Sequence, residues 1–401
     1  MARQASISRT SSAAAEPRFP VVTLAAAFAG AVAAIVSIAV SELFAGLLAG
    51  APSLVVAIGQ LVIDLQPPGA KDFVVDLFGT NDKLALNAIV VLAALLIAAV
   101  LGIVARRRFA VGAAGFAAFG ALAFVAALRQ PLIDPILAAI TALVATWLGI
   151  HALAWLVGQL RPADSGQAAR RPVAAGSMPD WSRRHFLVRA GGLGVASLAL
   201  AGAGRRMLET RPGGASGTGT IPPLPAPSQT AAPLPAGAAL SVPGITPLVV
   251  PNADFYRIDT ALIVPRVDVT TWQLHVRGMV DREIVMTYED LRAMPQLQQY
   301  VTIACVSNKV GDHLVGNALW SGIRLRDVLA RAGVQQGATQ LVGRSVDDFT
   351  VGFPTEWAMD PSREPMIAIG MNGQPLPLEH GFPARLIVPG LFGYVSATKW
   401  L

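Results

Sequence analysis

Long apolar segments in the first half of the chain are the feature that most constrains its fold. The clearest run from Pro20 to Val40, Leu84 to Ala105, Phe109 to Leu128 and Leu132 to Val157, and a weaker one runs from Phe186 to Gly204. About 20 apolar residues in a helix span the hydrocarbon core of a bilayer. The chain is 53% hydrophobic and only 14% charged, which is too apolar for an ordinary soluble protein. We therefore expect an all-α transmembrane anchor domain of about five helices over residues 1–204, in contact with membrane lipid.

A sixth apolar run, Leu43 to Ile63, is broken by Gly50 and Pro52, and the charge distribution indicates whether it crosses. If it does not cross, most arginines of the anchor fall on one side and the acidic connection falls on the other. These arginines are Arg3, Arg9, Arg18, Arg106, Arg107, Arg108, Arg161, Arg170, Arg171, Arg183 and Arg184, and the acids are Asp64, Asp72, Asp76 and Asp82. Because cytoplasmic loops carry the excess of Lys and Arg, the pattern favours five spans, with the broken run re-entrant or interfacial. The second half of the chain is then extracytoplasmic, although Arg129, Arg205, Arg206 and Arg211 fall on the wrong side.

The sequence offers little chemistry inside the bundle. Only His151 lies within a predicted span, with His185 at a border, whereas a membrane haem usually needs two facing histidines. Anchoring is the simpler interpretation, and a docking surface for a quinone or a partner is the alternative. The net charge of +6 comes largely from arginines at membrane borders, so it indicates orientation and not nucleic-acid binding. We find no zinc-ligand spacing and no phosphate-binding glycine loop.

The segment Ser182-Arg-Arg-His-Phe-Leu187 precedes the last predicted span. Two arginines at a membrane border satisfy the positive-inside rule by themselves. The segment is also similar to the twin-arginine export signal, which carries folded domains across the membrane. Both interpretations remain open.

The second half is predicted to contain a linker and one soluble domain. Residues 205–250 are rich in Pro, Gly and Ala and predict a flexible tether. Residues 251–401 mix short strands with short helices, which indicates an α+β domain. The expected elements are a strand over Trp272 to Arg277, a helix that Thr287 caps, a helix over Leu325 to Ala332, a hairpin with a type I′ turn at Asn372-Gly373 and a strand over Ala384 to Val388.

Cys305 is the only cysteine in the chain. It follows Val301 and Ile303 at alternate positions, so it should end a strand and face the same side as they do. A single thiol cannot form an internal disulfide. It is either a small buried apolar residue or a thiolate that binds a metal or attacks a substrate.

Four stretches in order make residues 251–401 resemble the molybdopterin-binding domain of the sulfite oxidase family. They are Phe255-Tyr-Arg257 followed by Pro265, Cys305-Val-Ser-Asn308, Trp320-Ser-Gly-Ile-Arg-Leu325, and the group Met371-Asn-Gly-Gln-Pro-Leu-Pro, Glu379-His-Gly-Phe-Pro-Ala-Arg385, Val388-Pro-Gly390 and Lys399-Trp-Leu401. The resemblance implies a molybdenum–molybdopterin cofactor whose metal is bound by Cys305. A soft thiolate suits a redox-active transition metal.

The resemblance also assigns roles to five other side chains. It implies that His380, Arg385 and Lys399 contact the phosphate and pterin of the cofactor, and an arginine within an apolar strand is costly unless it is paired. It implies that Arg257 meets an anionic substrate; the alternative is an ion pair with Asp254 or Asp259. Asn308 either orients the cofactor or is only a turn residue.

The chain departs from the family in three places. Asp259 stands where the family often has a histidine, which puts one cofactor contact in question. Lys309 and Gly311-Asp312-His313 stand where sulfite-oxidising members carry further arginines. The chain also stops at Lys399-Trp-Leu401, where the family continues, so we expect that the C-terminal end is truncated or that something else completes the site.

Together these features predict a membrane-anchored, molybdopterin-dependent oxidoreductase that transfers an oxygen atom on a small oxyanion such as sulfite. Its electrons would leave through an external carrier, either a cytochrome or a quinone-linked protein. The alternatives are a reductase of sulfoxides or of another oxyanion, and a non-catalytic membrane module.

Overall fold

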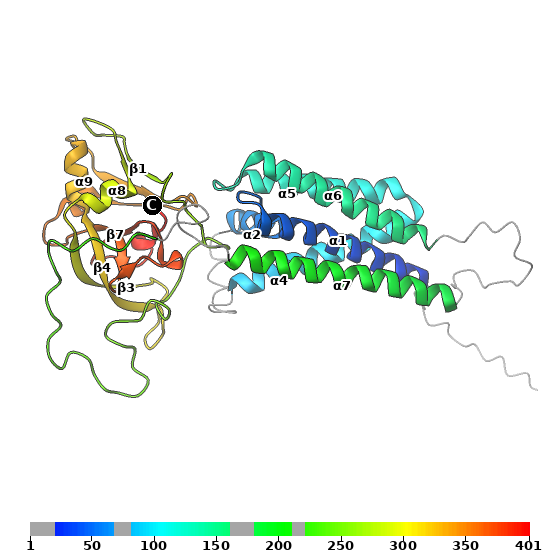
Figure 1. The fold of residues 1–401 in the computed structure, drawn as a ribbon, viewed down its shortest axis with the longest axis horizontal. Coiled ribbons are helices and arrows are strands. Elements are labelled where there is room, and N and C mark those ends of the chain that lie inside the picture. The colour runs from blue at the N-terminus through cyan, green and yellow to red at the C-terminus, as the bar shows by residue number, and fades with distance from the viewer. Residues whose placement is uncertain (1–20, 68–81, 161–179, 211–220) are drawn as a thin grey trace, which may run out of the picture. The chain divides into compact units, whose positions relative to one another are not determined.

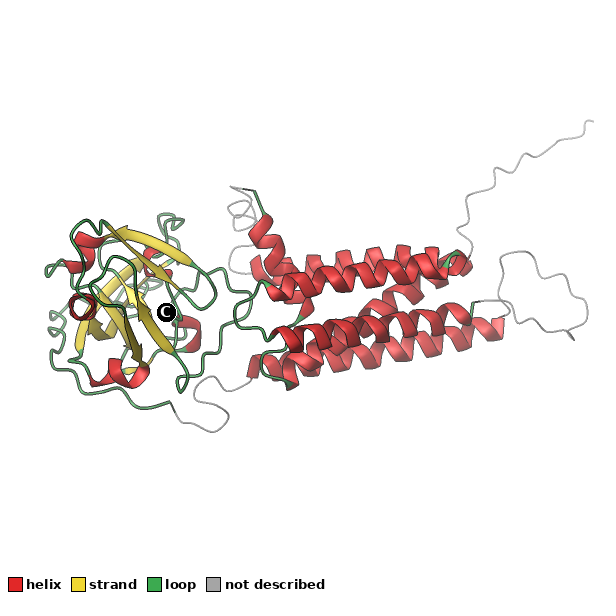
Figure 2. Ribbon diagram, turned by 90° about the horizontal axis from the view of Figure 1, so that it is seen from above, coloured by secondary structure: helices red, strands yellow, loops and turns green. Residues whose placement is uncertain are grey.

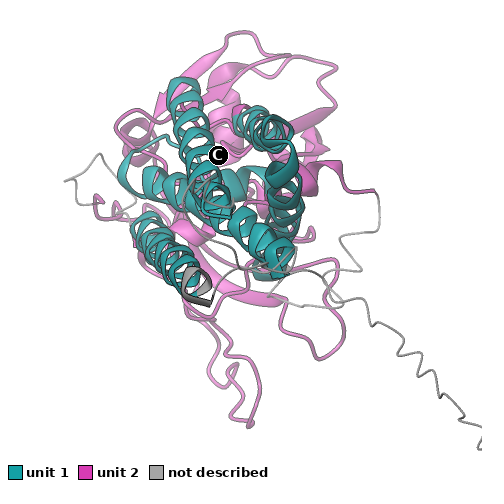
Figure 3. Ribbon diagram, turned by 90° about the vertical axis from the view of Figure 1, so that its right-hand side faces the viewer, with its two compact units in different colours: residues 1–58, 72–127, 135–209 teal, residues 59–71, 128–134, 210–401 magenta. Residues whose placement is uncertain are grey.

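The computed structural model describes residues 21–67, 82–160, 180–210 and 221–401. Predictions that concern Arg3, Arg9, Arg18, Asp72, Asp76, Arg161, Arg170, Arg171 and residues 211–220 lie outside these ranges. The chain divides into two compact units, which Figure 3 distinguishes by colour. The first comprises Met1–Ile58, Asp72–Ala127 and Pro135–Glu209, and the second comprises Gly59–Lys71, Leu128–Asp134 and Thr210–Leu401.

The first unit is a bundle of helices (Figure 1). Its helices are α1 (Val21–Leu47), α4 (Asp82–Arg107), α5 (Phe109–Leu128), α6 (Pro135–Gly158) and α7 (Asp180–Thr210), and α2 (Leu54–Leu65) begins within it. Among the described residues, five helices are long and apolar enough to cross a membrane, which confirms the predicted number. The broken apolar run divides between the end of α1 and α2. The 12 residues of α2 extend only about 18 Å at 1.5 Å per residue, which is too short to span a bilayer core.

Small residues let the helices of the bundle approach closely. A Cβ atom on Gly30 of α1 would overlap the carbonyl of Ala98 on α4, and Gly102 of α4 has the same relation to Ala26. A Cβ atom on Gly149 of α6 would overlap the side-chain hydroxyl of Ser37 on α1. Without a hydrophobic driving force in lipid, such close approach is how membrane helices gain packing energy. Helix α1 therefore packs against both α4 and α6.

Charged groups near the ends of α1 and α7 are paired with one another. Arg205 on α7 lies 3.7 Å from the buried carboxylate of Glu42 on α1 and 2.8 Å from Glu209. Ser53 donates a hydrogen bond to the other oxygen of Glu42. These ion pairs give a local reason for the position of Arg205, which the positive-inside pattern does not explain.

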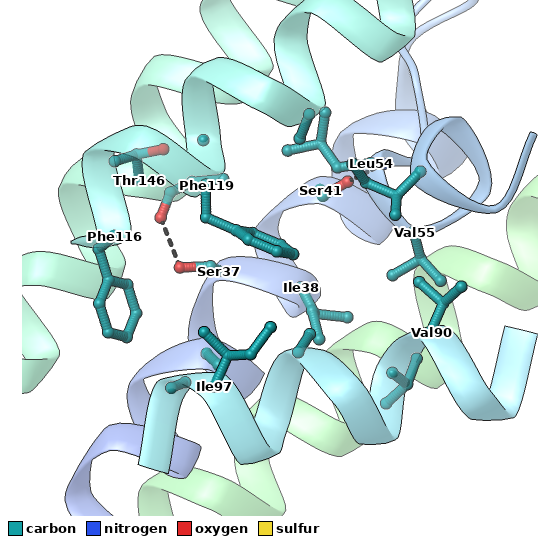
Figure 4. Close-up of a pocket in the computed structure, with 18 of the residues that line it drawn as sticks. Ser37, Ile38, Ser41, Leu54, Val55, Val90, Ile97, Phe116, Phe119 and Thr146 are labelled. Carbon is teal, nitrogen blue, oxygen red and sulfur yellow. Dashed lines mark hydrogen bonds between the residues drawn. The ribbon is translucent and has the colours of Figure 1, made fainter. Parts of the chain in front are cut away.

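The bundle also contains a partly open apolar pocket of about 80 Å³ between α1, α2, α4, α5 and α6 (Figure 4). Ile38, Ile97 and Phe119 contribute to its walls. Two of its polar groups are engaged within the protein, since Ser37 donates to the carbonyl of Ala145 at 2.9 Å and Ser41 accepts from the backbone amide of Leu54 at 2.7 Å.

The second unit is built on an antiparallel sheet, seen as yellow arrows in Figure 2. The sheet runs in the order β3 (Leu297–Ala304), β4 (Val315–Arg324), β7 (Met366–Met371) and β8 (Gln374–Pro375), and β9 (Arg385–Ile387) also pairs with β7. Two hairpins flank it, β1 (Gln273–Val276) with β2 (Ile284–Thr287) and β5 (Gln340–Arg344) with β6 (Thr350–Pro354). The helices are α8 (Tyr288–Ala293), α9 (Leu325–Ala332) and α10 (Thr355–Met359), with the 3₁₀ turns η2 (Leu378–His380) and η3 (Val395–Ala397). The predicted α+β fold is confirmed.

The central strand β7 has a hydrophobic core on each face. Met366 and Ala368 pack into one core with Trp320, whereas Ile367 and Ile369 pack into the other. Successive strand residues point to opposite faces, so a strand buried on both faces appears as a continuous apolar run.

Local signals set several element boundaries as predicted. Thr287 and Asp290 form a reciprocal capping box at the start of α8. Helix α9 ends at Gly333, whose φ of 71° is in the left-handed region that favours glycine. Asn372 and Gly373 have φ of 51° and 78° between β7 and β8, as a type I′ turn requires.

Part of the predicted linker packs on the domain and is not a free tether. The amides of Ser228 and Gln229 donate to the carbonyl of Gln296, and the carbonyl of Gln229 accepts from Gln298 at 2.8 Å. Val250 is buried and donates to Asn317 at 2.9 Å. Hydrogen bonding to β3 and β4 outweighs the weak apolar content of these segments, so the packed domain includes residues before 251.

Candidate active site

Strand β3 delivers Cys305 to the edge of the core that contains Trp320. Val301 and Ile303 are buried and Thr302 is exposed, so the predicted alternation is confirmed. Cys305 follows the last residue of β3, and its amide donates to the carbonyl of Leu314 at 2.8 Å. The thiol is free and partly exposed. Its position at the mouth of a loop, not within the apolar interior, leaves it open to a ligand.

Asn308 closes the loop that follows Cys305. Its backbone amide donates to the carbonyl of Cys305 at 3.0 Å, and its side-chain Oδ1 accepts from the backbone amide of Leu314 at 2.8 Å. These bonds fix the loop against the end of β3. The structure therefore accounts for Asn308 as a loop-forming residue that orients Cys305 indirectly.

The C-terminal segments bring three basic side chains together. His380 ends η2, Arg385 begins β9 and Lys399 follows η3, and all three are buried. Arg385 donates from Nε to the carbonyl of Ser396 at 2.7 Å, and its guanidinium lies 5.2 Å from the Trp320 ring. The three buried basic residues that the sequence singled out therefore share one site, where Arg385 also donates to the carbonyl of His380.

Asp259 is the acidic member of this site. Its carboxylate accepts from Arg257 Nε at 2.6 Å and from Lys399 Nζ at 2.9 Å. Lys399 also donates to the carbonyl of Glu379 at 3.2 Å. Arg257 thus makes one of the two ion pairs considered as alternatives to substrate binding, but with a carboxylate that is only 3% exposed.

Burial shifts the pKa values of the basic groups. Burial lowers the pKa of Lys399 to about 7 despite the opposing effect of Asp259, and it lowers the pKa of Arg385 to about 10. Burial also lowers the pKa of His380 to about 4, and the cations Arg385 and Lys399 act in the same direction. His380 is therefore neutral at pH 7, and its Nε2 must be the protonated nitrogen because it lies 2.8 Å from the carbonyl of Asn252.

Each basic side chain of the site keeps some capacity for a ligand. The Nδ1 atom of His380 is buried without a hydrogen-bond partner, and in this tautomer it is an acceptor that suits an N–H or O–H group. Among the described residues, no hydrogen bond uses Nη1 of Arg257 or Nη2 of Arg385. A buried group of cations with donors to spare fits a phosphate, and the His380 acceptor fits the N–H groups of a pterin.

Tyr256 connects the thiol to the basic cluster, and sequence reasoning missed it. Burial raises the pKa of Tyr256 to about 12, Arg385 opposes this and Cys305 adds to it, so both groups lie within its electrostatic range. A Cβ atom on Gly393 would overlap the Tyr256 hydroxyl, and the amide of Gly393 donates to the carbonyl of Ala304 at 2.7 Å. Tyr256 directly precedes Arg257 in one of the stretches that carry the family resemblance, and this was the available sequence signal for it.

The donor set therefore fits the molybdenum cofactor that the sequence predicts: a partly exposed thiol for a metal, and buried cations with a neutral imidazole for a phosphorylated pterin. Among the described residues there is no group of three or more His, Cys, Asp or Glu side chains that could hold a metal ion.

Comparisons with known proteins agree with this geometry. Residues 261–401 match the family described as oxidoreductase molybdopterin binding domain. The chain is 34% identical over 176 residues to human mitochondrial sulfite oxidase and 35% identical over 164 residues to nitrate reductase [NADH] 1 of rice, Oryza sativa subsp. japonica. These alignments cover 38% and 34% of this chain, but only 32% of sulfite oxidase and 18% of nitrate reductase.

One solved structure, the sulfane dehydrogenase SoxCD from Paracoccus pantotrophus, matches 39% of this chain and 43% of its own, with 26% identity and a TM-score of 0.36. The family model and the sulfite oxidase alignment agree on the class: residues 261–401 match a molybdopterin-binding oxidoreductase domain and are similar to sulfite oxidase. In the part of the chain that the structure describes, five helices of membrane-spanning length precede this domain. The predicted resemblance and its cofactor class are thereby confirmed.

Proposed function

We propose that this chain is a membrane-anchored, molybdenum-cofactor-dependent oxidoreductase that transfers an oxygen atom on a small oxyanion such as sulfite. The observation that carries the proposal is the partly exposed Cys305 beside a buried cationic cluster, within a domain that matches the molybdopterin-binding family. A protein thiolate and a phosphate site are the two attachments that such a cofactor needs.

Each residue of the site has a role toward the cofactor. Cys305 would bind the molybdenum, while Arg385 and Lys399 would bind the phosphate. His380 would accept a hydrogen bond from the pterin through Nδ1. The bound cofactor would supply the two-electron oxygen-transfer chemistry.

Arg257 would bind the substrate oxyanion. Its Nε and Nη2 atoms donate hydrogen bonds to Asp259, and this leaves Nη1 as a donor whose direction is fixed. A guanidinium that is held in place can stabilise negative charge without reorganising. Oxidation of sulfite to sulfate takes an oxygen from water and releases two protons and two electrons, and an external carrier, a cytochrome or a quinone-linked protein, would take the electrons.

The membrane topology belongs to the same proposal. Five spans would place the N-terminus and Arg106–Arg108 in the cytoplasm and the catalytic domain outside, in agreement with the positive-inside rule. The ion pairs of Arg205 with Glu42 and Glu209 support this orientation, because they lower the cost of an arginine on the outer side. The Ser182–Leu187 segment lies at the start of α7, and its role as an export signal remains a prediction. A periplasmic-type reporter fused after Leu240 should be active, whereas activity only of a cytoplasmic reporter there would contradict five spans.

A second candidate is a reductase of another oxyanion or of a sulfoxide with the same cofactor. The similarity to nitrate reductases favours it, since those relatives are named for the reductive direction. Reaction direction depends on the substrate and the electron partner, so both directions have to be assayed.

The test is expression of the full chain in a host that makes the cofactor, followed by measurement of molybdenum and turnover. We expect about one molybdenum per chain, and sulfite oxidation with an artificial acceptor that exceeds reduction of nitrate and sulfoxides. Metal-loaded protein that only reduces these compounds would support the second candidate. Protein without molybdenum would refute both and leave the non-catalytic membrane module.

A further inference from the structure

Asp259 joins Arg257, which lies 2 residues before it in the chain, to Lys399, which lies 140 residues after it. One of its oxygens, Oδ2, accepts from both Arg257 Nε at 2.6 Å and Lys399 Nζ at 2.9 Å. The other, Oδ1, accepts from Arg257 Nη2 at 3.1 Å. The side chains of Asp259 and Lys399 are 3% and 2% exposed, so solvent cannot replace these bonds.

The bonds to Asp259 leave one side of each cation for a ligand. They occupy the Nε edge of the Arg257 guanidinium, and no described residue accepts from its Nη1. Lys399 has three ammonium protons, of which Asp259 and the carbonyl of Glu379 take two. The carboxylate therefore fixes which donors of the two side chains remain available.

Asp259 also favours the charged form of Lys399. Burial is the largest influence on that ammonium and brings its pKa to about 7, Arg385 and Arg257 act in the same direction, and Asp259 opposes them. The other ionisable neighbours are Asp347, whose pKa burial raises, and the neutral His380. Asp259 is the one carboxylate in direct contact with Lys399 among the described residues.

We propose that Asp259 is a positioning residue that holds Arg257 beside Lys399 and keeps Lys399 cationic, so that the two side chains present adjoining donors to an anion. This inference rests on the proposed function for the identity of the anions, the cofactor phosphate at Lys399 and the oxyanion substrate at Arg257. It gives a role to Asp259, which stands at a position where the family often has a histidine.

The test compares three variants of the full chain. Asp259→Asn keeps the shape and removes the charge, and Asp259→Glu keeps the charge with a longer side chain. Asp254→Asn is the matched control, because Asp254 is an exposed carboxylate five residues earlier. Cofactor-loaded protein is assayed for KM and kcat with sulfite, per bound molybdenum, from pH 6 to pH 9.

For Asp259→Asn we expect KM at pH 6 to rise about ten-fold or more, since charge-assisted hydrogen bonds are lost, with a smaller change in kcat. The effect should shrink towards pH 9, where Lys399 is largely neutral even in the wild type because its pKa is about 7. Asp259→Glu should recover the wild-type pH profile in part, and Asp254→Asn should match the wild type. If Asp259→Asn reduces only the amount of folded protein, with KM and pH profile unchanged per molybdenum, Asp259 has a structural role alone and the inference is wrong.

A second measurement does not depend on activity. Full-length chain from a host that lacks molybdopterin is melted with and without inorganic phosphate across the same pH range. Phosphate should raise the Tm of wild type and Asp254→Asn, and this gain should vanish at a lower pH in Asp259→Asn. Equal pH dependence in all variants would overturn the inference. If wild-type chain binds no molybdenum in the first experiment, the proposed function fails, while the phosphate melts still decide on Asp259.

Discussion

Acidification should destabilise the C-terminal unit through His380. The imidazole is 3% exposed and packs edge-on against Phe255 at 5.6 Å. Protonation would place a charge in this apolar contact, close to the cations Arg385 and Lys399. The neutral form is the one that the folded structure accommodates.

The expected size follows from the pKa difference between the two states. An unfolded chain binds the proton at a pKa near 6.5, whereas the pKa in the folded unit is about 4. Between these values the unfolded state holds more protons, so the free energy of unfolding falls as pH falls from about 6.5 to 4 and is insensitive to this group below 4. A difference of about 2.5 in pKa corresponds to a loss of about 3 kcal/mol.

The assay is denaturant unfolding of the full chain in detergent at pH 7 and pH 4.5, followed by tryptophan fluorescence. His380→Gln can keep the hydrogen bond to Asn252 without a titrating group, so it should lose less stability than wild type over this range. His275→Gln, at an exposed position of β1, is the control and should behave as wild type. Equal pH dependence in wild type and His380→Gln would refute the reasoning, because carboxylates would then account for the whole effect.

Three further predictions concern single positions. Cys305→Ser should retain the fold, because the side chain is partly exposed, but lose molybdenum; full metal content would contradict its role as a ligand. Gly204→Ala should destabilise the detergent-solubilised chain by about 1–3 kcal/mol and lower its Tm, because a Cβ there would overlap the backbone at Glu42. Gly202→Ala, with open space around it, should leave the Tm unchanged; equal Tm values for the two variants would disprove this contact. Tyr256→Phe should keep the metal but change the visible spectrum of the loaded site, since the hydroxyl is within electrostatic range of Cys305; an unchanged spectrum would place the hydroxyl outside the site.

Local patterns made most secondary structure predictable. Helix α5 and helix α9 have the predicted bounds, because apolar length sets one and helical spacing before Gly333 sets the other. The Asn372-Gly373 turn follows from the need for positive φ at both positions. Each of these signals acts within about 20 residues of the chain.

Contacts between distant segments were not predictable in the same way. Asp259 was noted as a departure from a family pattern and as a possible ion-pair partner of Arg257, but nothing local indicates that Lys399 would reach it. The pairing of Glu42 with Arg205 depends on how α1 and α7 pack, and the binding of Gln229 beside β3 depends on an edge that only the folded sheet offers. The sequence identified which charged groups would be costly to bury but could not identify their partners.

The central claim is that Cys305 binds molybdenum, and X-ray absorption at the molybdenum edge tests it most directly. The full chain and its Cys305→Ser variant are compared after production in the same cofactor-competent host. The account predicts about one molybdenum per wild-type chain, with one more sulfur neighbour than any metal that remains in the variant. The same number of sulfur neighbours in both proteins, or a wild-type chain without molybdenum, would contradict it.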